Sequence, residues 1–321
     1  MGKLVQPPDR APKGRSYSRR PRRTPSPEGL SWDRDGFDWP NRQASRFVQT
    51  ARLRWHVQSM GDGPVLLLLH GTGASTHSWR DLAPLLSRSF NIVAADLPGH
   101  AFTETPPRDR LSLRGMAREV GELLAALAIE PALVVGHSAG AAIMIRMTLD
   151  GIIAPRGLVS LNGALLPFRG LASQFFSPLA KLMALNPLVP RLFAWRASER
   201  SSVERLIGNT GSTLDSAGVE FYRRLVSDHR HVAAALAMMA NWRLKPLVRD
   251  LPNLNCPLLL VAGGTDRAVS SDQAFRVREY LPSATVNYLR GLGHLAHEEQ
   301  PEKIAQIIIE WASSLNLSPN E

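Results

Sequence analysis

A serine between two glycines is the clearest candidate for covalent chemistry in this sequence. Ser138 stands in Gly136-His-Ser-Ala-Gly140, after the apolar run 133–135 and before a helix-forming stretch at 141–149. A sharp turn between a buried strand and a helix holds such a serine in a strained conformation, and side chains two residues to either side would collide. Glycine at both positions removes that collision. The pattern therefore predicts a nucleophilic serine raised above the end of a strand.

A serine hydroxyl needs a general base, and a carboxylate behind that base, before it can act as a nucleophile. Asp266 follows the apolar run 258–262, and His294 follows the last strand-like run, 285–289. The carboxyl ends of parallel strands meet at one edge of a sheet, where ligands bind. The chain order Ser138, Asp266, His294 also accompanies this type of serine turn. We therefore predict that these three residues form a catalytic triad.

Other histidines compete with His294 for the role of base. His297 offers a second base or one half of a metal pair, but no cysteine or carboxylate at zinc-ligand spacing accompanies it. The Gly-x-Gly before His294 supplies the backbone freedom that a base over the sheet requires, which favours His294. His229 and His231 have no partners in the sequence, so we expect them at the surface. No metal site and no cofactor are predicted.

An oxyanion beside the serine needs N–H donors aimed at it. Ala139 begins the predicted helix, so its N–H is free to point at that oxygen. The second donor is expected in His70-Gly71-Thr72-Gly73, which follows the apolar run 65–69 in the position of a glycine-rich oxyanion loop. We choose Thr72. A phosphate-binding loop is the alternative, but G-x-G-x-x-G and Walker patterns are absent from this segment.

Apolar runs alternate with amphipathic helical stretches over most of the chain, which predicts an α/β fold with a mostly parallel, doubly wound sheet. Two alternating segments, 46–50 and 53–58, predict an antiparallel hairpin at its start. Ser112 is expected to cap a helix, and Pro301 to open the closing helix. The parallel strands are expected at 65–69, 91–95, 133–135, 157–161, 258–262 and 285–289.

The chain divides into a tail, a core in two parts and an insertion. Residues 1–44 are expected to form a disordered, basic tail rich in Pro and Arg. Residues 45–163 and 246–321 are expected to form the core. Residues 164–245 have no strand pattern and predict a helical cap. Prolines and charges interrupt the apolar part of that cap, which argues against a membrane-spanning helix.

Composition bounds the partners and the compartment. Residues 1–30 carry eight Lys or Arg against two acidic residues, so they hold +6 of the net charge of +10. Two interpretations of this tail stay open: contact with an anionic membrane or an acidic partner, or a solubilising extension. The single cysteine, Cys256, excludes a disulfide framework and fits a cytoplasmic protein, with peripheral membrane contact as the alternative. No nucleic-acid partner is expected.

Five motifs, HGTG, DLPGH, GHSAG, GGTD and GLGH, resemble those of the α/β-hydrolase superfamily over about residues 45–315. The resemblance implies an α/β-hydrolase fold. Ser138 stands where dehalogenases and epoxide hydrolases of this fold carry aspartate, which argues against those chemistries. Asn162 stands where some relatives carry an alternative acid, and an amide cannot replace a carboxylate, which favours Asp266. Ala101 departs from the glycine that usually follows the DLPGH turn.

Longer stretches, including LLLLHGTGASTHSWRDLAPLL, NPLVPRLFAWRA, ALAMMANW and GLGHLAHEE, resemble the hydrolases described as magnesium-chelatase accessory proteins of bacteriochlorophyll biosynthesis. This resemblance implies a photosynthetic bacterium, a tetrapyrrole or its ester as ligand, and a magnesium chelatase subunit as partner. Two functions stay open. One is a serine hydrolase that cleaves an ester of an apolar substrate through an acyl-serine. The other is a non-catalytic chelatase accessory or tetrapyrrole-carrier protein on a hydrolase fold.

The predicted cap is rich in large apolar side chains, more than a lid over a small polar substrate needs. We therefore expect an apolar roof above the serine, which suits a flat or long apolar ligand. Contacts with substrate are expected from strand ends and from the cap. The candidates are Gly71, Trp79, Asn162, Phe175, Phe193 and Trp242.

Overall fold

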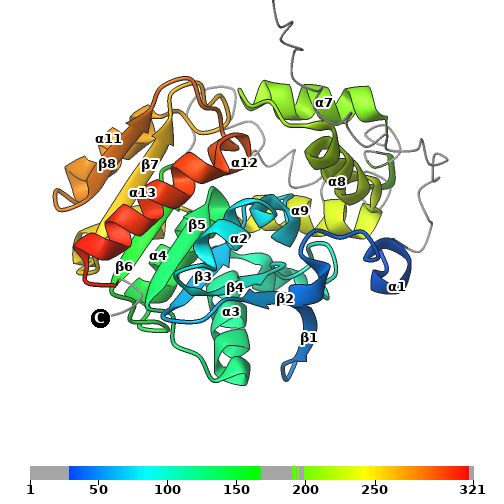
Figure 1. Ribbon diagram of the computed structural model, residues 1–321, viewed down its shortest axis with the longest axis horizontal. Helices are drawn as coiled ribbons and strands as arrows, with labels where there is room; N and C mark the ends of the chain where they lie inside the picture. Colours follow the sequence, from blue (N-terminus) through cyan, green and yellow to red (C-terminus); the bar gives the residue numbers. More distant parts are fainter. Residues whose placement is uncertain (1–28, 168–189, 193, 195–198, 318–321) are drawn as a thin grey trace, which may run out of the picture.

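Eight strands form one mixed sheet at the centre of the molecule (Figure 1). The computed structural model describes residues 29–317, except 168–189, 193 and 195–198. The strand order is β1-β2-β4-β3-β5-β6-β7-β8. The strands are β1 (Ser45–Gln49), β2 (Arg54–Met60), β3 (Val65–Leu69), β4 (Asn91–Ala95), β5 (Leu133–His137), β6 (Gly157–Leu161), β7 (Leu258–Gly263) and β8 (Thr285–Leu289).

Strand directions agree with the predicted α/β-hydrolase fold. β1 and β2 form the expected antiparallel hairpin, β2 is antiparallel to β4, and all later neighbours are parallel. The described helices outside the cap are α1 (Trp32–Asp35), α2 (Leu82–Leu86), α3 (Leu113–Leu127), α4 (Ala139–Leu149), α10 (Lys245–Asp250), α11 (Asp272–Tyr280), α12 (Ala296–Glu299) and α13 (Pro301–Ser314). Four short 3-10 turns accompany them at η1 (Arg42–Ala44), η2 (Thr76–Trp79), η3 (Arg108–Leu111) and η5 (Leu251–Asn253).

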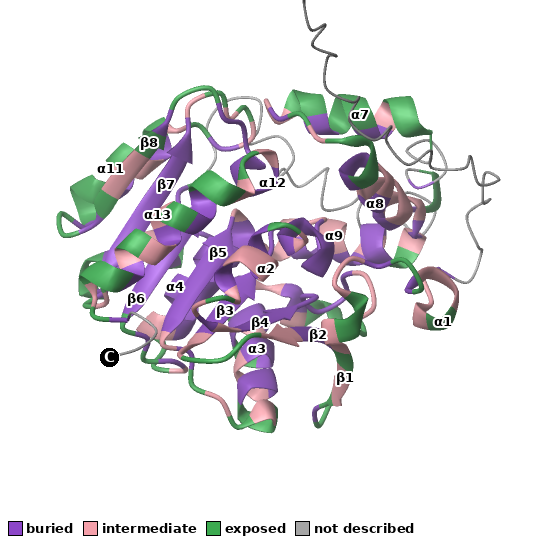
Figure 2. Ribbon diagram, viewed as in Figure 1, coloured by how far each residue is buried: buried purple, intermediate pink, exposed green. Residues whose placement is uncertain are grey.

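The central strands are buried on both faces, as continuous apolar runs predict. Successive side chains point to opposite faces of a strand. Leu67 and Leu69 therefore pack with α3 and α4, whereas Leu66 and Leu68 pack with α2 and α13. Figure 2 shows these strands as the buried centre of the molecule. This double cover makes the sheet a rigid platform, and its strand ends hold the candidate site.

Two predicted helix starts are confirmed. The Ser112 hydroxyl accepts a hydrogen bond from Gly115 N at 3.2 Å and so satisfies one free N–H of the first turn of α3. Pro301 occupies the first turn of α13, where its missing N–H costs nothing.

The described part of the insertion between β6 and β7 contains helices and connecting loops but no strand. Its helices are α7 (Arg200–Asn209), α8 (Ser216–Ser227) and α9 (His229–Asn241). They lie together at one side of the molecule, with α1 next to them (Figure 1). Phe175 and Phe193, two of the expected substrate contacts, fall outside the described residues.

The expectation of a disordered tail through residue 44 is wrong for residues 29–44. The Trp39 side chain is only 2% exposed, and its Nε1 donates a hydrogen bond to Thr76 Oγ1 at 3.1 Å. It shares a buried cluster with Phe221 and Leu225 of α8. Arg224 on the same helix pairs with Asp38 at 2.6 Å. The two tryptophans of this segment bury apolar surface against the folded core. The charged residues around them made the sequence resemble that of a disordered tail.

Two smaller features bear on the sequence interpretation. Cys256 is half-buried, its Sγ donates to Pro155 O at 3.2 Å, and burial raises the pKa of its thiol to about 11. It is thus a packed residue just before the start of β7. Across the described part of the chain, every helix is too short or too polar to cross a membrane.

Candidate active site

Ser138 occupies a strained turn between β5 and α4. Its backbone φ is 51° and ψ is −112°, a conformation that side-chain-bearing residues rarely adopt. A Cβ at Gly136 would lie 2.5 Å from Ala141 N, and a Cβ at Gly140 would collide with the carbonyl oxygen of Leu69. Both glycines are therefore needed for steric reasons, and the predicted strand-turn-helix geometry is confirmed.

His294 and Asp266 form a hydrogen-bonded pair. The distance from His294 Nδ1 to Asp266 Oδ2 is 2.7 Å, and the Asp266 side chain is fully buried. The second carboxylate oxygen accepts from the N–H groups of Ala268 and Val269, each at 2.8 Å. A carboxylate is an acceptor, so Nδ1 carries the proton and Nε2 keeps its lone pair. The pair therefore holds one imidazole nitrogen ready to accept a proton.

Asn162 joins the core to the base turn, which is the segment 291–295 that carries His294. It is not a substrate contact. Its Nδ2 donates to the carbonyl oxygens of Gly293 and His294 at 2.9 and 2.8 Å, and its Oδ1 accepts from Gly263 N at 2.6 Å. These three bonds pair both the nitrogen and the oxygen of the side-chain amide with β7 and the base turn. The sequence placed Asn162 correctly at a strand end, but only the structure shows that it faces the protein.

His137 links the serine turn to the base turn. Its Nε2 donates to the His294 carbonyl oxygen at 2.9 Å, and the two rings lie 4.7 Å apart. Burial lowers the pKa of His137 well below its usual value, so the ring is neutral. The sequence motif alone assigns His137 no role beyond its place in the turn. Its position next to Ser138 was the signal that could have singled it out.

His297, the competing base, faces away from the acid. Its Nε2 lies 2.8 Å from Ser78 Oγ, its ring packs against Trp79 at 4.7 Å, and burial lowers its pKa to about 3. Trp79 itself is fully buried in the cluster beneath the sheet. The expectation that Trp79 contacts substrate is therefore wrong, because its helical face is turned to the core.

The loop after β3 lies against the serine. A Cβ on Gly71 would be 3.0 Å from Ser138 Cβ and 2.9 Å from His137 Nδ1, so glycine permits this approach. His70 holds the loop: its Nδ1 donates to Gly71 O at 2.8 Å, and its Nε2 accepts from Leu97 N at 2.8 Å. Burial lowers the pKa of His70 to about 3, so it keeps this neutral form.

The cap closes over the same loop. The Thr72 hydroxyl donates to Met238 Sδ at 3.6 Å, and Met238 on α9 is fully buried. His231 Nε2 donates to Gly73 O at 3.2 Å, while His231 Nδ1 accepts from Ala101 N at 3.1 Å. His231 was expected at the surface, but it is buried, and burial lowers its pKa to about 4.

Trp242, the remaining expected contact in the cap, follows α9 and is half-buried against the main core cluster. Its Nε1 has no hydrogen-bond partner among the described residues. The structure therefore brings Gly71, Thr72 and Ala139 around Ser138, with Trp242 packed below α9. In the described part of the chain, no group of three or more His, Cys, Asp or Glu side chains is arranged to hold a metal ion.

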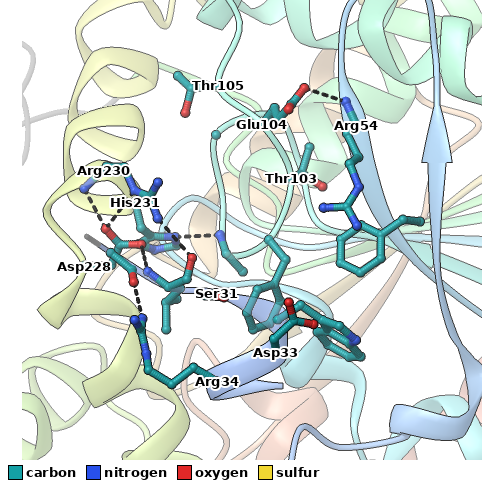
Figure 3. A pocket seen from close by; sticks show the side chains of 17 residues that line it. Ser31, Asp33, Arg34, Arg54, Thr103, Glu104, Thr105, Asp228, Arg230 and His231 are labelled. Atoms are coloured by element: carbon teal, nitrogen blue, oxygen red, sulfur yellow. Dashed lines mark hydrogen bonds and ion pairs between the residues drawn. The ribbon is translucent and has the colours of Figure 1, made fainter. Parts of the chain in front are cut away.

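A cavity of about 430 Å³ lies between residues 29–34, residues 99–105 and the start of α9 (Figure 3). Asp228, Arg230 and His231 form one wall, and Arg54 and Glu104 form the opposite one. None of the predicted triad residues lines it. Among the described residues, His231 lines this cavity and also contacts the loop after β3, whereas Ser138 is not part of the lining.

The fold and the site define a member of the α/β-hydrolases. A model of the Alpha/beta hydrolase family matches residues 66–307, and the chain belongs to this family. It is 38% identical over 276 residues to the magnesium-chelatase 30 kDa subunit of Rhodobacter capsulatus, covering 85% of this chain and 96% of that protein.

Two further similarities are more distant. Haloalkane dehalogenase 2 of Mycobacterium bovis is 27% identical over 281 residues, which cover 83% of this chain and 94% of that protein. The structure of an esterase from Rhodococcus sp. ECU1013 superposes with a TM-score of 0.67 at 22% identity, covering 85% of this chain and 99% of that one. At this identity the esterase supports the fold alone.

Proposed function

We propose that the protein is a serine hydrolase that cleaves an ester, or a similar acyl bond, of an apolar substrate through an acyl-Ser138 intermediate. The observation that carries this proposal is the buried His294–Asp266 pair at 2.7 Å, set at the same sheet edge as a serine in a strained turn. A protein that only binds ligands has no need for a strained serine beside an oriented imidazole.

The proposed reaction has two steps. Ser138 Oγ attacks the substrate carbonyl carbon while its proton passes to His294 Nε2, and Asp266 stabilises the imidazolium that forms. The tetrahedral intermediate collapses, the C–O bond to the alcohol breaks, and His294 returns the proton to the leaving oxygen. A water molecule then attacks the acyl-serine with the same base, which releases the acid and restores Ser138.

The oxyanion is proposed to lie between two backbone donors. Ala139 N–H is in the first turn of α4, where N–H groups have no intrahelical acceptor. Thr72 N–H comes from the loop that Gly71 allows to approach Ser138. One such donor contributes about 2.7–4 kcal/mol of transition-state stabilisation. His70 and His231 hold this loop from both sides, so they are proposed to position the donor.

The proposed substrate class rests on the apolar side chains expected in the cap. Met238 and Ala237 on α9 are buried in the same cluster as the core, and Met238 Sδ contacts Thr72 above the serine turn. The similarity to the magnesium-chelatase 30 kDa subunit favours a tetrapyrrole ester and a role in bacteriochlorophyll biosynthesis. The same similarity supports the second candidate, a non-catalytic chelatase accessory or tetrapyrrole carrier that binds a chelatase subunit.

Covalent labelling separates the two candidates. We expect a fluorophosphonate to label Ser138 of the wild type, with the adduct located by mass spectrometry. Ser138→Ala should abolish labelling, and His294→Ala or Asp266→Asn should slow it by about 10³-fold or more. Circular dichroism should show that each variant is folded. A folded wild type that stays unlabelled would contradict the hydrolase and favour the carrier.

Binding to Ser138→Ala protein tests the substrate class. We expect a porphyrin ester, with or without magnesium, and a long-chain ester to bind more tightly than a short-chain ester, because α9 presents apolar side chains. Replacing Met238 by Ala should weaken the two apolar ligands more than the short one. Equal or tighter binding of the short-chain ester would exclude an apolar roof.

A further inference from the structure

Residues 210–213 of the cap contact both the base turn and the acid turn, which is the segment 263–267 that carries Asp266. They join α7 to α8 and therefore belong to the insertion, not to the core. The carbonyl oxygen of Thr210 accepts from Arg267 N at 3.0 Å and from His294 N at 3.4 Å. One carbonyl of the cap thus contacts the residue after Asp266 and the base itself.

Two side chains extend this contact to the neighbours of His294. Ser212, which is buried, accepts a hydrogen bond from Leu295 N at 2.8 Å through its Oγ. Glu299 accepts from Gly293 N through one carboxylate oxygen and from Thr213 N through the other, both at 2.8 Å. Three consecutive amides of the base turn therefore donate either to the cap or to a carboxylate that is itself bonded to the cap.

The backbones at this contact approach too closely for any side chain between them. Gly211 has φ of +84°, and a Cβ there would collide with the carbonyl oxygen of Thr265 in the acid turn. A Cβ on Gly293 would collide with Gly211 O and Ser212 Oγ. Both glycines therefore allow the cap segment to pack directly on the two turns.

The base turn is held from two sides that belong to different parts of the molecule. Its carbonyl oxygens are held by the core, because Asn162 donates to Gly293 O and His294 O and His137 also donates to His294 O. Its amides are held by the cap and Glu299. The turn itself contains two glycines, so its own sequence restricts its rotation little.

We propose that residues 210–213 position the catalytic base, with Ser212 and Glu299 as the positioning residues. This inference rests on the proposed hydrolase function. His294 lies in the segment whose three backbone amides are held by these hydrogen bonds. A small rotation of this segment would therefore move Nε2 relative to Ser138. A displacement of about 1 Å costs about a hundredfold in rate.

Fluorophosphonate labelling of Ser212→Ala and Glu299→Gln tests the proposal. Alanine leaves Leu295 N without its acceptor, and glutamine can accept from only one of the two amides. We expect the limiting rate of labelling at saturating probe to fall about ten- to a hundredfold, with the half-saturating concentration unchanged. The matched controls are Ser201→Ala and Glu302→Gln, which change exposed residues and should label like wild type. Wild-type rates in both variants would overturn the proposal.

A second measurement does not depend on activity. The proton shared by His294 Nδ1 and Asp266 gives a low-field ¹H NMR resonance, which we assign by its loss in His294→Ala. We expect this resonance to broaden or shift in Ser212→Ala and Glu299→Gln and to stay in place in the two controls. If wild type is not labelled, the hydrolase proposal fails and the resonance alone decides the positioning role. An unchanged resonance in folded variants would refute that role.

Discussion

The turn that carries Ser138 and the turn that carries His294 are held in different ways. The serine turn follows mainly from adjacent residues, a buried strand, two glycines and a helix that starts at the next residue, while Leu69 and Gly71 of the β3 end pack closely against it. The base turn receives its restraints from residues far away in the chain, including His137, Asn162, Thr210 and Ser212.

This difference predicts how substitutions disturb the geometry at each end of the site. A substitution near Ser138 acts through steric collision in a few residues. A substitution near His294 acts through hydrogen bonds that join β5, β6, the cap and α12. The nucleophile should therefore tolerate movement of the cap, whereas the base should not.

Acid should destabilise both ends together. Burial lowers the pKa of His70, His100 and His297 to about 3 and that of His231 to about 4. The unfolded chain binds protons at these residues below about pH 6.5. The folded chain binds them only near its lower values, so these residues favour folding above pH 6.5, and that stability is lost as the pH falls towards 4.

As the pH falls from about 6.5 towards 4, each of these histidines lowers the free energy of unfolding by about 1.4 kcal/mol for every pH unit. Urea unfolding at pH 7.5, 6 and 5 measures the change. Equal midpoints at the three pH values would show that these rings are accessible to protons in the folded state.

Gly140→Ala should break the nucleophile end. The added methyl would collide with Leu69 O in the middle of the sheet, so we expect a loss of more than about 3 kcal/mol of unfolding free energy. Gly208→Ala on α7 is the matched control, because nothing lies within 4 Å of its added Cβ. That helix substitution should be neutral or stabilise by up to about 1 kcal/mol. Thermal unfolding of both variants decides.

The segment around Trp39 resembles the base turn, because tertiary contacts hold it in place. Trp39→Ala should cost about 3–5 kcal/mol, since the ring is buried between Thr76 and α8. Deletion of residues 1–40 should therefore destabilise the protein. Deletion of residues 1–28 should leave its thermal midpoint unchanged and weaken binding to anionic vesicles. The same midpoint for both deletions would contradict the role of Trp39.

Asn162→Ala should loosen the base end. It removes a donor to two carbonyl oxygens and an acceptor for Gly263 N, and we expect a loss of roughly 2–3 kcal/mol. Labelling of Ser138 should slow as well, because His294 is less restrained. Asn162→Asp should be worse, since a carboxylate would face two carbonyl oxygens. Asn253→Ala, an exposed change, is the control and should have neither effect.

Ala101→Gly should have the smallest effect. Ala101 has a φ of 45°, a left-handed conformation that favours glycine. We expect the substitution to stabilise the protein by roughly 0.5–1 kcal/mol, the strain relieved less the added chain entropy. The labelling rate should not change, because the residue contacts His231 only through its backbone N–H. A lower melting temperature would show that the turn is not strained.

Several features of the fold followed directly from residue patterns. Apolar runs gave the strands because a parallel sheet covered on both faces needs continuous apolar residues. Ser112 and Pro301 predicted two helix starts because the first turn of any helix has the same unpaired N–H groups. These signals lie within a few residues of one another, so no knowledge of distant contacts is required.

Side-chain direction was the point at which sequence patterns failed. Trp79 and Asn162 were predicted to contact substrate, yet Trp79 packs in the core and Asn162 binds the base turn. His231 was expected in water but bridges the cap and the loop after β3. A one-dimensional pattern gives the position of a residue along an element, while its neighbours across the fold decide what its side chain meets.

The serine turn could be predicted from the sequence, because strand, glycines and helix are adjacent in the chain, even though the atom that an added Cβ at Gly140 would meet belongs to Leu69. It also gave the order of Asp266 and His294 after two strands. Only the tertiary structure decided which histidine meets the carboxylate and which parts of the chain hold it there. The reason is physical: the hydrogen bonds around His294 join residues separated by up to 157 positions, and only folding brings these together.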